Sequence, residues 1–168
     1  RGDIMNGRLP AYKKSFFLSP ERPDGLQLQI FHEDGIVYSD LLIDNRFEGY
    51  AEVLHGGMIF GILDVIVWYA IVMRTKIVAM TRKAEMEFFK PIMCSAPYRA
   101  KAEMLRIEDR DIISTAWIED PAGEVYARLN AVFREGKGLA MDAFIDRFDF
   151  STTTPAIKDY FLSLLETV

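Results

Sequence analysis

Residues 54–73 read LHGGMIFGILDVIVWYAIVM, and the architecture of the chain follows from this segment. It is the most apolar part of the chain, and Asp64 is the only charged side chain between residues 58 and 73. Its length and composition predict a helix from about Gly56 to Arg74. Residues 58–73 form a run of only sixteen residues with a carboxylate inside it, which is too short to cross a bilayer, because a span takes about 20 apolar residues. A helix buried in the core is therefore the better interpretation, and we expect no membrane partner.

Strand-like patterns flank this helix on both sides. The predicted strands are residues 26–33, 36–43, 76–91, 98–108, 111–120 and 124–135. Runs of strands around a single helix are typical of an α+β domain. We therefore predict one long central helix wrapped by a highly curved antiparallel sheet of five to six strands.

The rest of the chain is less regular. We predict a polar lead-in over residues 1–25, a domain that holds the helix and the sheet over residues 26–135, and a helical extension over residues 136–168. In this extension, Thr154 and Pro155 are suited to the N-cap and first position of a terminal helix.

The charge of the chain bears on its partners. A net charge of −5 argues against nucleic-acid binding, which needs a basic face. Residues 74–106 nevertheless hold eight basic and only three acidic side chains. Either these cations lie on solvated strand faces, or they form a patch for a polyanionic small molecule.

Cysteine and histidine are scarce. Cys94 is the only cysteine, which excludes an intrachain disulfide and favours a reducing, cytoplasmic location. His32 and His55 are the only histidines and show no zinc-ligand spacing, so we expect no metal.

The central helix also predicts an oligomer. A helix that is apolar nearly all round needs cover on two sides, and one sheet supplies only one. We therefore expect an obligate homodimer, and a dimer of dimers stays open. His55 and Asp64 are nine residues apart, so a helix places them on opposite sides and ~13 Å apart along its axis. A site that contains both must come from two chains.

The start of the helix has a chemical use. Amides at a helix N-terminus are unsatisfied and carry the positive end of the dipole, and Gly56-Gly57 lets a ligand approach them. Such amides can hold an oxyanion, while Asp64 can act as general base or nucleophile. Alternatively, Asp64 caps another helix or pairs with a cation, and His55 is only the first residue of its helix.

Three segments resemble a known family. EGYAEVLHGGMIFGILD (48–64) resembles the HGG-x6-D signature of hotdog-fold thioesterases of the PaaI-like superfamily. AMTRKAEMEFFKPI (79–92) is similar to that family's T-x6-F-x-K-P strand, and AWIEDPAGEVYARLNAVF (116–133) to its final strand–turn–strand. Two positions depart from the pattern: Gly49 stands where many members have Asn, and Ala51-Glu52 where a close subgroup has Pro-Gly.

The resemblance implies a hotdog fold and hydrolysis of acyl-CoA thioesters. It makes Gly56 the oxyanion amide, with His55 near the thioester carbonyl. It makes Asp64 the general base or nucleophile, contributed by the other subunit. Thr81 would then orient the attacking water.

An acyl-CoA substrate would give the basic strand region a ligand. We expect Gly57, Arg82, Lys83 and Lys90 to bind the substrate, with coenzyme A present only as part of it and no separate cofactor. Two other functions stay open: a hotdog dehydratase or hydratase, and a non-catalytic acyl-CoA-binding protein.

Overall fold

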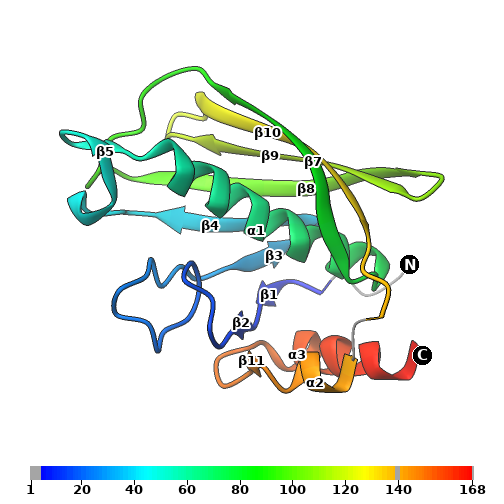
Figure 1. Ribbon diagram of the computed structural model, residues 1–168. Coiled ribbons are helices and arrows are strands. Elements are labelled where there is room, and N and C mark those ends of the chain that lie inside the picture. Colours follow the sequence, from blue (N-terminus) through cyan, green and yellow to red (C-terminus); the bar gives the residue numbers. More distant parts are fainter. Residues whose placement is uncertain (1–4, 139–140, 168) are drawn as a thin grey trace.

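The computed structural model describes residues 5–138 and 141–167. A long helix lies against one face of an antiparallel sheet (Figure 1). The strands follow the spatial order β1 (Gly7–Arg8), β3 (Phe31–Glu33), β4 (Ile36–Leu41), β8 (Tyr98–Glu108), β9 (Asp111–Glu119), β10 (Val125–Glu135) and β7 (Ala79–Phe88). The predicted α+β class is confirmed. The sheet has seven strands rather than five to six, because the two-residue β1 joins the edge at β3.

Helix α1 (Gly56–Thr75) is the predicted central helix. Ile62, Leu63, Ile66 and Val67 are fully buried on a helix that contacts β4, β7, β8, β9 and β10. Burial of each such side chain contributes about 1.5–3 kcal/mol. Within the described residues, α1 is the one helix long and apolar enough to span a membrane by length and composition. Its packing on the sheet is that of a core helix.

Both ends of the chain pack beside the C-terminal half of α1, beyond the β1 edge of the sheet (Figure 1). Strand β2 (Ala11–Tyr12) pairs with β11 (Phe148–Asp149), and helices α2 (Met141–Ile145) and α3 (Pro155–Leu162) flank this ladder. Trp68 of α1 lies 6.0 Å from Phe148 between ring centroids. The chain itself therefore covers part of the helix surface that we expected a partner to cover. The homodimer stays a prediction, but the apolar surface of α1 is no longer a sufficient argument for it.

Several element boundaries differ from the predicted ones. Gln27 has a φ of 50°, so residues 26–30 do not continue β3, and Leu26 and Leu28 donate backbone hydrogen bonds to Phe16 and Phe17. After α1, Lys76 adopts a left-handed conformation and ends the helix, which delays β7 to residue 79. The terminal helix ends at residue 162 and continues as a 3-10 turn, Ser163–Thr167. The proposed boundaries at residues 25 and 135 stay predictions.

Candidate active site

The N-terminus of α1 presents hydrogen-bond donors. His55 is the N-cap, and its Nδ1 accepts a hydrogen bond from the Gly57 N–H at 2.8 Å. Met58 and Ile59 donate their N–H groups to the His55 carbonyl. Of the first four amides of α1, Gly56 alone has no acceptor within the described residues. Because Nδ1 accepts, the proton of a neutral His55 ring lies on Nε2. The helix start thus offers two donors to a ligand.

A cavity of about 680 Å³ surrounds these donors. A hairpin of β5 (Glu48–Tyr50) and β6 (Val53–Leu54) forms one wall, and residues 88–92 form another. A Cβ built on Gly56 would lie 3.4 Å from Phe88 Cζ, so this aromatic ring from the end of β7 lies beside the free amide. At Gly49, a Cβ would lie 3.2 Å from His55 Cα. The chain therefore has little room for the asparagine that many relatives carry there.

Asp64 and Thr81 meet in a different place. Thr81 Oγ1 donates a hydrogen bond of 2.6 Å to Asp64 Oδ1. Burial raises the pKa of the Asp64 carboxyl, and the hydrogen bond from Thr81 partly opposes this shift. Within the described residues Asp64 forms no ion pair and caps no helix, so neither structural alternative for this acid finds support.

A β-bulge brings Thr81 to Asp64. In a regular strand Thr81 and Lys83 share one face. In the ladder between β7 and β10, Lys83 lies opposite Val132, whereas Thr81 lies opposite the next residue, Phe133. Arg82 is therefore an extra residue, and a bulge of this kind re-aims the side chains that precede it. Thr81 faces α1, while Lys83 faces away from it.

The two halves of the predicted site are separate in one chain. Asp64 and Thr81 line a second cavity, of about 510 Å³, and none of its lining residues also lines the cavity at His55 and Gly56. This agrees with the expectation that His55 and Asp64 cannot meet on one helix.

Most of the predicted basic ligands are paired with acids. Lys90 forms an ion pair with Glu124, and Arg82 lies 3.4 Å from Asp111. Lys83 is exposed and forms no ion pair within the described residues. Acids from other strands thus offset much of the charge in residues 74–106, which favours solvated strand faces over a preformed anion patch. Gly57 was predicted to bind substrate, but its amide already donates a hydrogen bond to His55 Nδ1.

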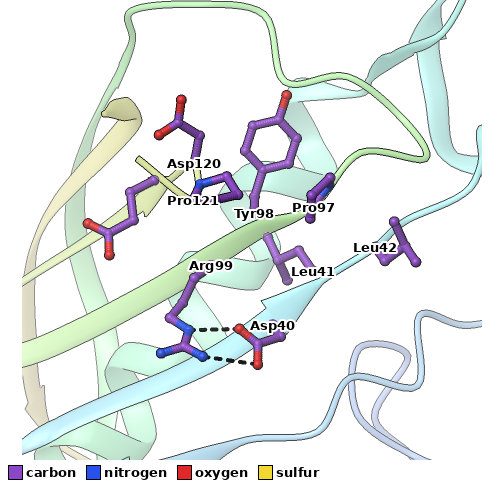
Figure 2. A pocket seen from close by; sticks show the side chains of 9 residues that line it. Asp40, Leu41, Leu42, Pro97, Tyr98, Arg99, Asp120 and Pro121 are labelled. Carbon is purple, nitrogen blue, oxygen red and sulfur yellow. Dashed lines mark hydrogen bonds and ion pairs between the residues drawn. The ribbon is translucent and has the colours of Figure 1, made fainter. Parts of the chain in front are cut away.

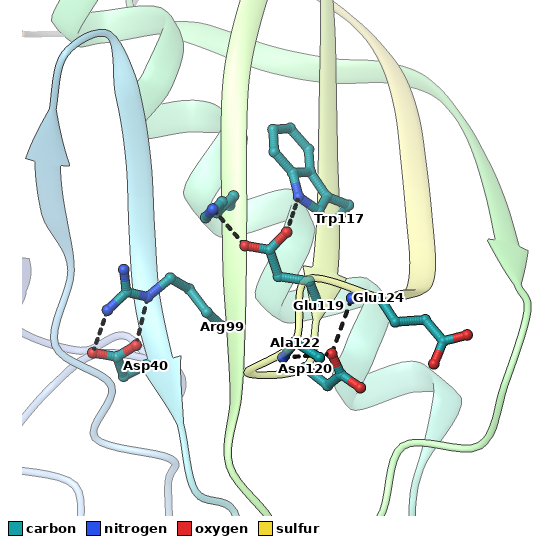
Figure 3. A network of polar contacts seen from close by, with 8 residues as sticks. Asp40, Arg99, Trp117, Glu119, Asp120, Ala122 and Glu124 are labelled. Atoms are coloured by element: carbon teal, nitrogen blue, oxygen red, sulfur yellow. Dashed lines mark hydrogen bonds and ion pairs between the residues drawn. The ribbon is translucent and has the colours of Figure 1, made fainter.

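A third cavity, of about 460 Å³, lies where β4 ends and β8 begins (Figure 2). Arg99 binds Asp40 there through two hydrogen bonds of 2.7 and 3.2 Å. Nearby, Glu119 accepts from Trp117, and Asp120 accepts from the amides of its own turn (Figure 3). This cavity contains none of the predicted site residues, and its charged groups largely satisfy one another.

Comparison with known proteins identifies the class of this fold. Residues 51–127 match the family model of the thioesterase superfamily, and no curated protein matches the chain. The solved structures that match include a thioesterase superfamily protein with 18% identity and a TM-score of 0.69, covering 73% of this chain and 61% of that one.

Two further structures show the same fold. The E. coli PaaI protein from the phenylacetic acid degradation operon is 16% identical, with a TM-score of 0.59, and the match covers 66% of this chain and 80% of that one. A Streptococcus mutans protein bound to acetyl-CoA is 15% identical, with a TM-score of 0.56 and coverage of 62% and 83%. The predicted resemblance to PaaI-like hotdog proteins is confirmed: these structures show the hotdog fold, and residues 51–127 resemble the thioesterase superfamily.

Some residues of the cavity at Asp64 were missed from sequence, whereas Phe88, which lies beside Gly56, was part of the T-x6-F-x-K-P pattern. Phe17 and Phe144 line the cavity at Asp64 from segments on which no motif falls. Only their aromatic character distinguished them, and apolar side chains of this kind are more often part of a core.

Proposed function

We propose that the protein hydrolyses acyl-CoA thioesters at a site built by two copies of the chain. The observation that carries this proposal is the 2.6 Å hydrogen bond from Thr81 to Asp64, in a cavity whose other walls are mainly apolar. A half-buried carboxylate with a raised pKa is a better base for water than an exposed one. The match to the thioesterase superfamily and the acetyl-CoA in one structural neighbour support this substrate class.

The reaction follows from the placement of donors and base. Thr81 donates to Oδ1, which leaves Oδ2 of Asp64 to accept a proton from water. The water oxygen then bonds to the thioester carbonyl carbon, and the resulting oxyanion accepts hydrogen bonds from Gly56 N–H and His55 Nε2–H. When the C–S bond breaks, the thiolate of CoA takes the proton from Asp64. The products are a carboxylic acid and free CoA.

Strand β7 supports the two-chain arrangement. Within residues 5–138 and 141–167 it pairs with β10 on one side only, and an open edge of ten residues is a ready template for a second strand. Suppose that β7 pairs antiparallel with β7 of a second chain, with the two-fold axis between Lys83 and Ala84. Thr81 of one chain would then lie opposite Met86 of the other. Phe88, two residues on, contacts Gly56. This pairing would place Asp64 and Thr81 near the donors of the other chain.

The remaining parts of the proposal follow from the same chemistry. Hydrolysis by water and a carboxylate needs no metal or further cofactor, so CoA enters only with the substrate. A single cysteine is compatible with the cytoplasm, where acyl-CoA is made and used, and we propose that location.

The test is thiol release from short, long and aryl acyl-CoA by the wild type and by Asp64→Asn. General-base catalysis contributes about 10²- to 10⁴-fold, so we expect turnover to fall at least about a hundredfold in a variant that remains a dimer by light scattering. Undiminished turnover in Asp64→Asn would refute the mechanism. Binding of acyl-CoA without any turnover would instead indicate the non-catalytic alternative.

A further inference from the structure

Both ends of the chain contribute walls to the cavity at Asp64. One wall consists of residues 12 and 14–18, a second of side chains from α1 and β7, and a third of Phe144 and Phe148. The first and third walls lie outside residues 51–127, the part that matches the thioesterase superfamily. This cavity is therefore shaped in part by segments outside the matched region.

These terminal segments are fastened to α1 and to each other. The β2–β11 ladder sets Tyr12 opposite Phe148. The hydroxyl of Tyr69, on α1, is hydrogen-bonded to the Tyr12 backbone. One turn further along the helix, Tyr160 donates from its hydroxyl to the carbonyls of Val72 and Met73, at 2.7 and 3.0 Å. Walls held at several points can define the size of a ligand.

The surface that these walls present is strongly aromatic. Trp68 lies 5.6 Å from Phe144 between ring centroids and is stacked on Phe148. Phe17 lies so close to Gly61 of α1 that a Cβ there would come within 2.2 Å of its ring. Glycine at position 61 thus lets this ring reach the helix one turn before Asp64. Both Phe17 and Phe144 are only partly buried, as expected of side chains that border an open space.

We infer that this cavity takes the acyl group of the thioester, that this group is bulky and apolar, and that Phe17 and Phe144 set its size. The inference rests on the proposed function. A volume of about 510 Å³ lies in the range of pockets that enclose whole small ligands. An acetyl group would leave most of it unfilled. An aryl ring and a medium-length alkyl chain share the required chemistry.

Binding can be tested apart from catalysis. Trp68 lines the cavity, and Trp117 is the only other tryptophan, so Trp117→Phe makes Trp68 the sole reporter. In that variant, with Asp64→Asn added to prevent hydrolysis, fluorescence is titrated with acetyl-, octanoyl- and phenylacetyl-CoA. We expect octanoyl- or phenylacetyl-CoA to bind at least about tenfold more tightly than acetyl-CoA. If octanoyl-CoA binds more tightly, the cavity suits a linear alkyl chain. If phenylacetyl-CoA binds more tightly, it suits an aryl ring. Equal affinities, or no change in Trp68 emission, would overturn the inference.

Specificity supplies the second test. Phe144→Ala widens the cavity, and Val65→Phe, on the α1 wall, narrows it. We expect the ratio of kcat/KM for larger over smaller acyl groups to rise about tenfold in the first variant and to fall by a similar factor in the second. Phe31→Ala is the matched control, because Phe31 stacks on Tyr38 outside the cavity and should leave the ratio unchanged.

The two proposals fail in different ways. No hydrolysis of any acyl-CoA, together with a graded Trp68 response, would refute the proposed function and support the acyl cavity. Hydrolysis with unchanged ratios in folded Phe144→Ala and Val65→Phe would support the function and overturn the inference. If Phe144→Ala does not fold, Val65→Phe decides alone.

Discussion

The two cavities along α1 differ in what they can do. Among the described residues that line it, the cavity at the helix start has donors, the Gly56 amide and the His55 ring, but no carboxylate to act as a base. The cavity at Asp64 has a carboxylate with a raised pKa but, among its described lining residues, no free amides of a helix N-terminus. Each supplies what the other lacks. Under the proposed function, one chain carries two half-sites, and the distance along α1 prevents the donors and the base of the same chain from acting together.

The largest effect should come from removing one donor. Gly56→Pro deletes the N–H while keeping a backbone that suits the first helical position, and His55 already has the extended ψ of 132° that a following proline requires. We expect kcat to fall about 10²- to 10³-fold, as for other oxyanion donors. Gly56→Ala keeps the N–H and is the control. Equal rates for both variants, measured by thiol release, would exclude Gly56 as the oxyanion amide.

Mixing two inactive variants tests whether the half-sites combine. A heterodimer of Asp64→Asn and Gly56→Pro keeps one intact site, made of Asp64 from one chain and Gly56 from the other. Random mixing makes half of the dimers heterodimers, so we expect about a quarter of wild-type activity to return. Recovery is followed after unfolding and refolding the mixture. No recovery, with subunit exchange shown by mass spectrometry, would contradict a shared site.

A smaller effect is expected at Thr81. Thr81→Val keeps the shape but removes the hydrogen bond that lowers the pKa of Asp64. We expect kcat to fall about tenfold and the acid limb of the pH–rate profile to move to higher pH, because Asp64 must be ionised to act. Thr81→Ser should restore both. A lower rate with an unmoved limb would show that Thr81 does not act through Asp64.

The smallest effect concerns stability. Folding raises the pKa of Asp64, so the folded state binds this proton more tightly, and stability falls as pH rises from the ordinary carboxyl value through the folded-state pKa. At pH 7 we expect Asp64→Asn to stabilise the fold, by less than about 1 kcal/mol because solvent screens a half-buried group. Thermal unfolding at pH 7 and pH 3.5 measures this. The stabilisation by Asp64→Asn should be smaller at pH 3.5 than at pH 7. An equal stabilisation at both pH values would indicate that it comes from packing and not from the charge of Asp64.

The sequence predicted the helix and the later strands because their signals are local. Twenty residues of apolar helix and the turn Asp120–Gly123 need no distant partner to be recognised. The pairing of Tyr12 with Phe148 depends on segments more than a hundred residues apart, and no local pattern announces it. The early strand was predicted too long because alternation at Leu26 and Leu28 marks burial, which an irregular segment can also achieve.

The candidate site shows the same limit. The motif placed Asp64, Thr81 and Gly56 in the list of candidates, but period-two alternation puts Thr81 on the face of Lys83. Only the ladder with β10 shows the extra residue at Arg82. A bulge depends on how two strands are registered, and register is decided by both strands together.

This bulge gives β7 an unusual tolerance to change. Many side chains at position 82 would leave the backbone count, and thus the direction of Thr81, unchanged. Loss of one codon there would remove the extra residue and leave Thr81 opposite Phe133. Thr81 and Lys83 would then be neighbours on opposite faces of a regular strand, so Thr81 would still face α1. The direction of Thr81 is thus protected against substitution and against a single in-frame deletion at this position.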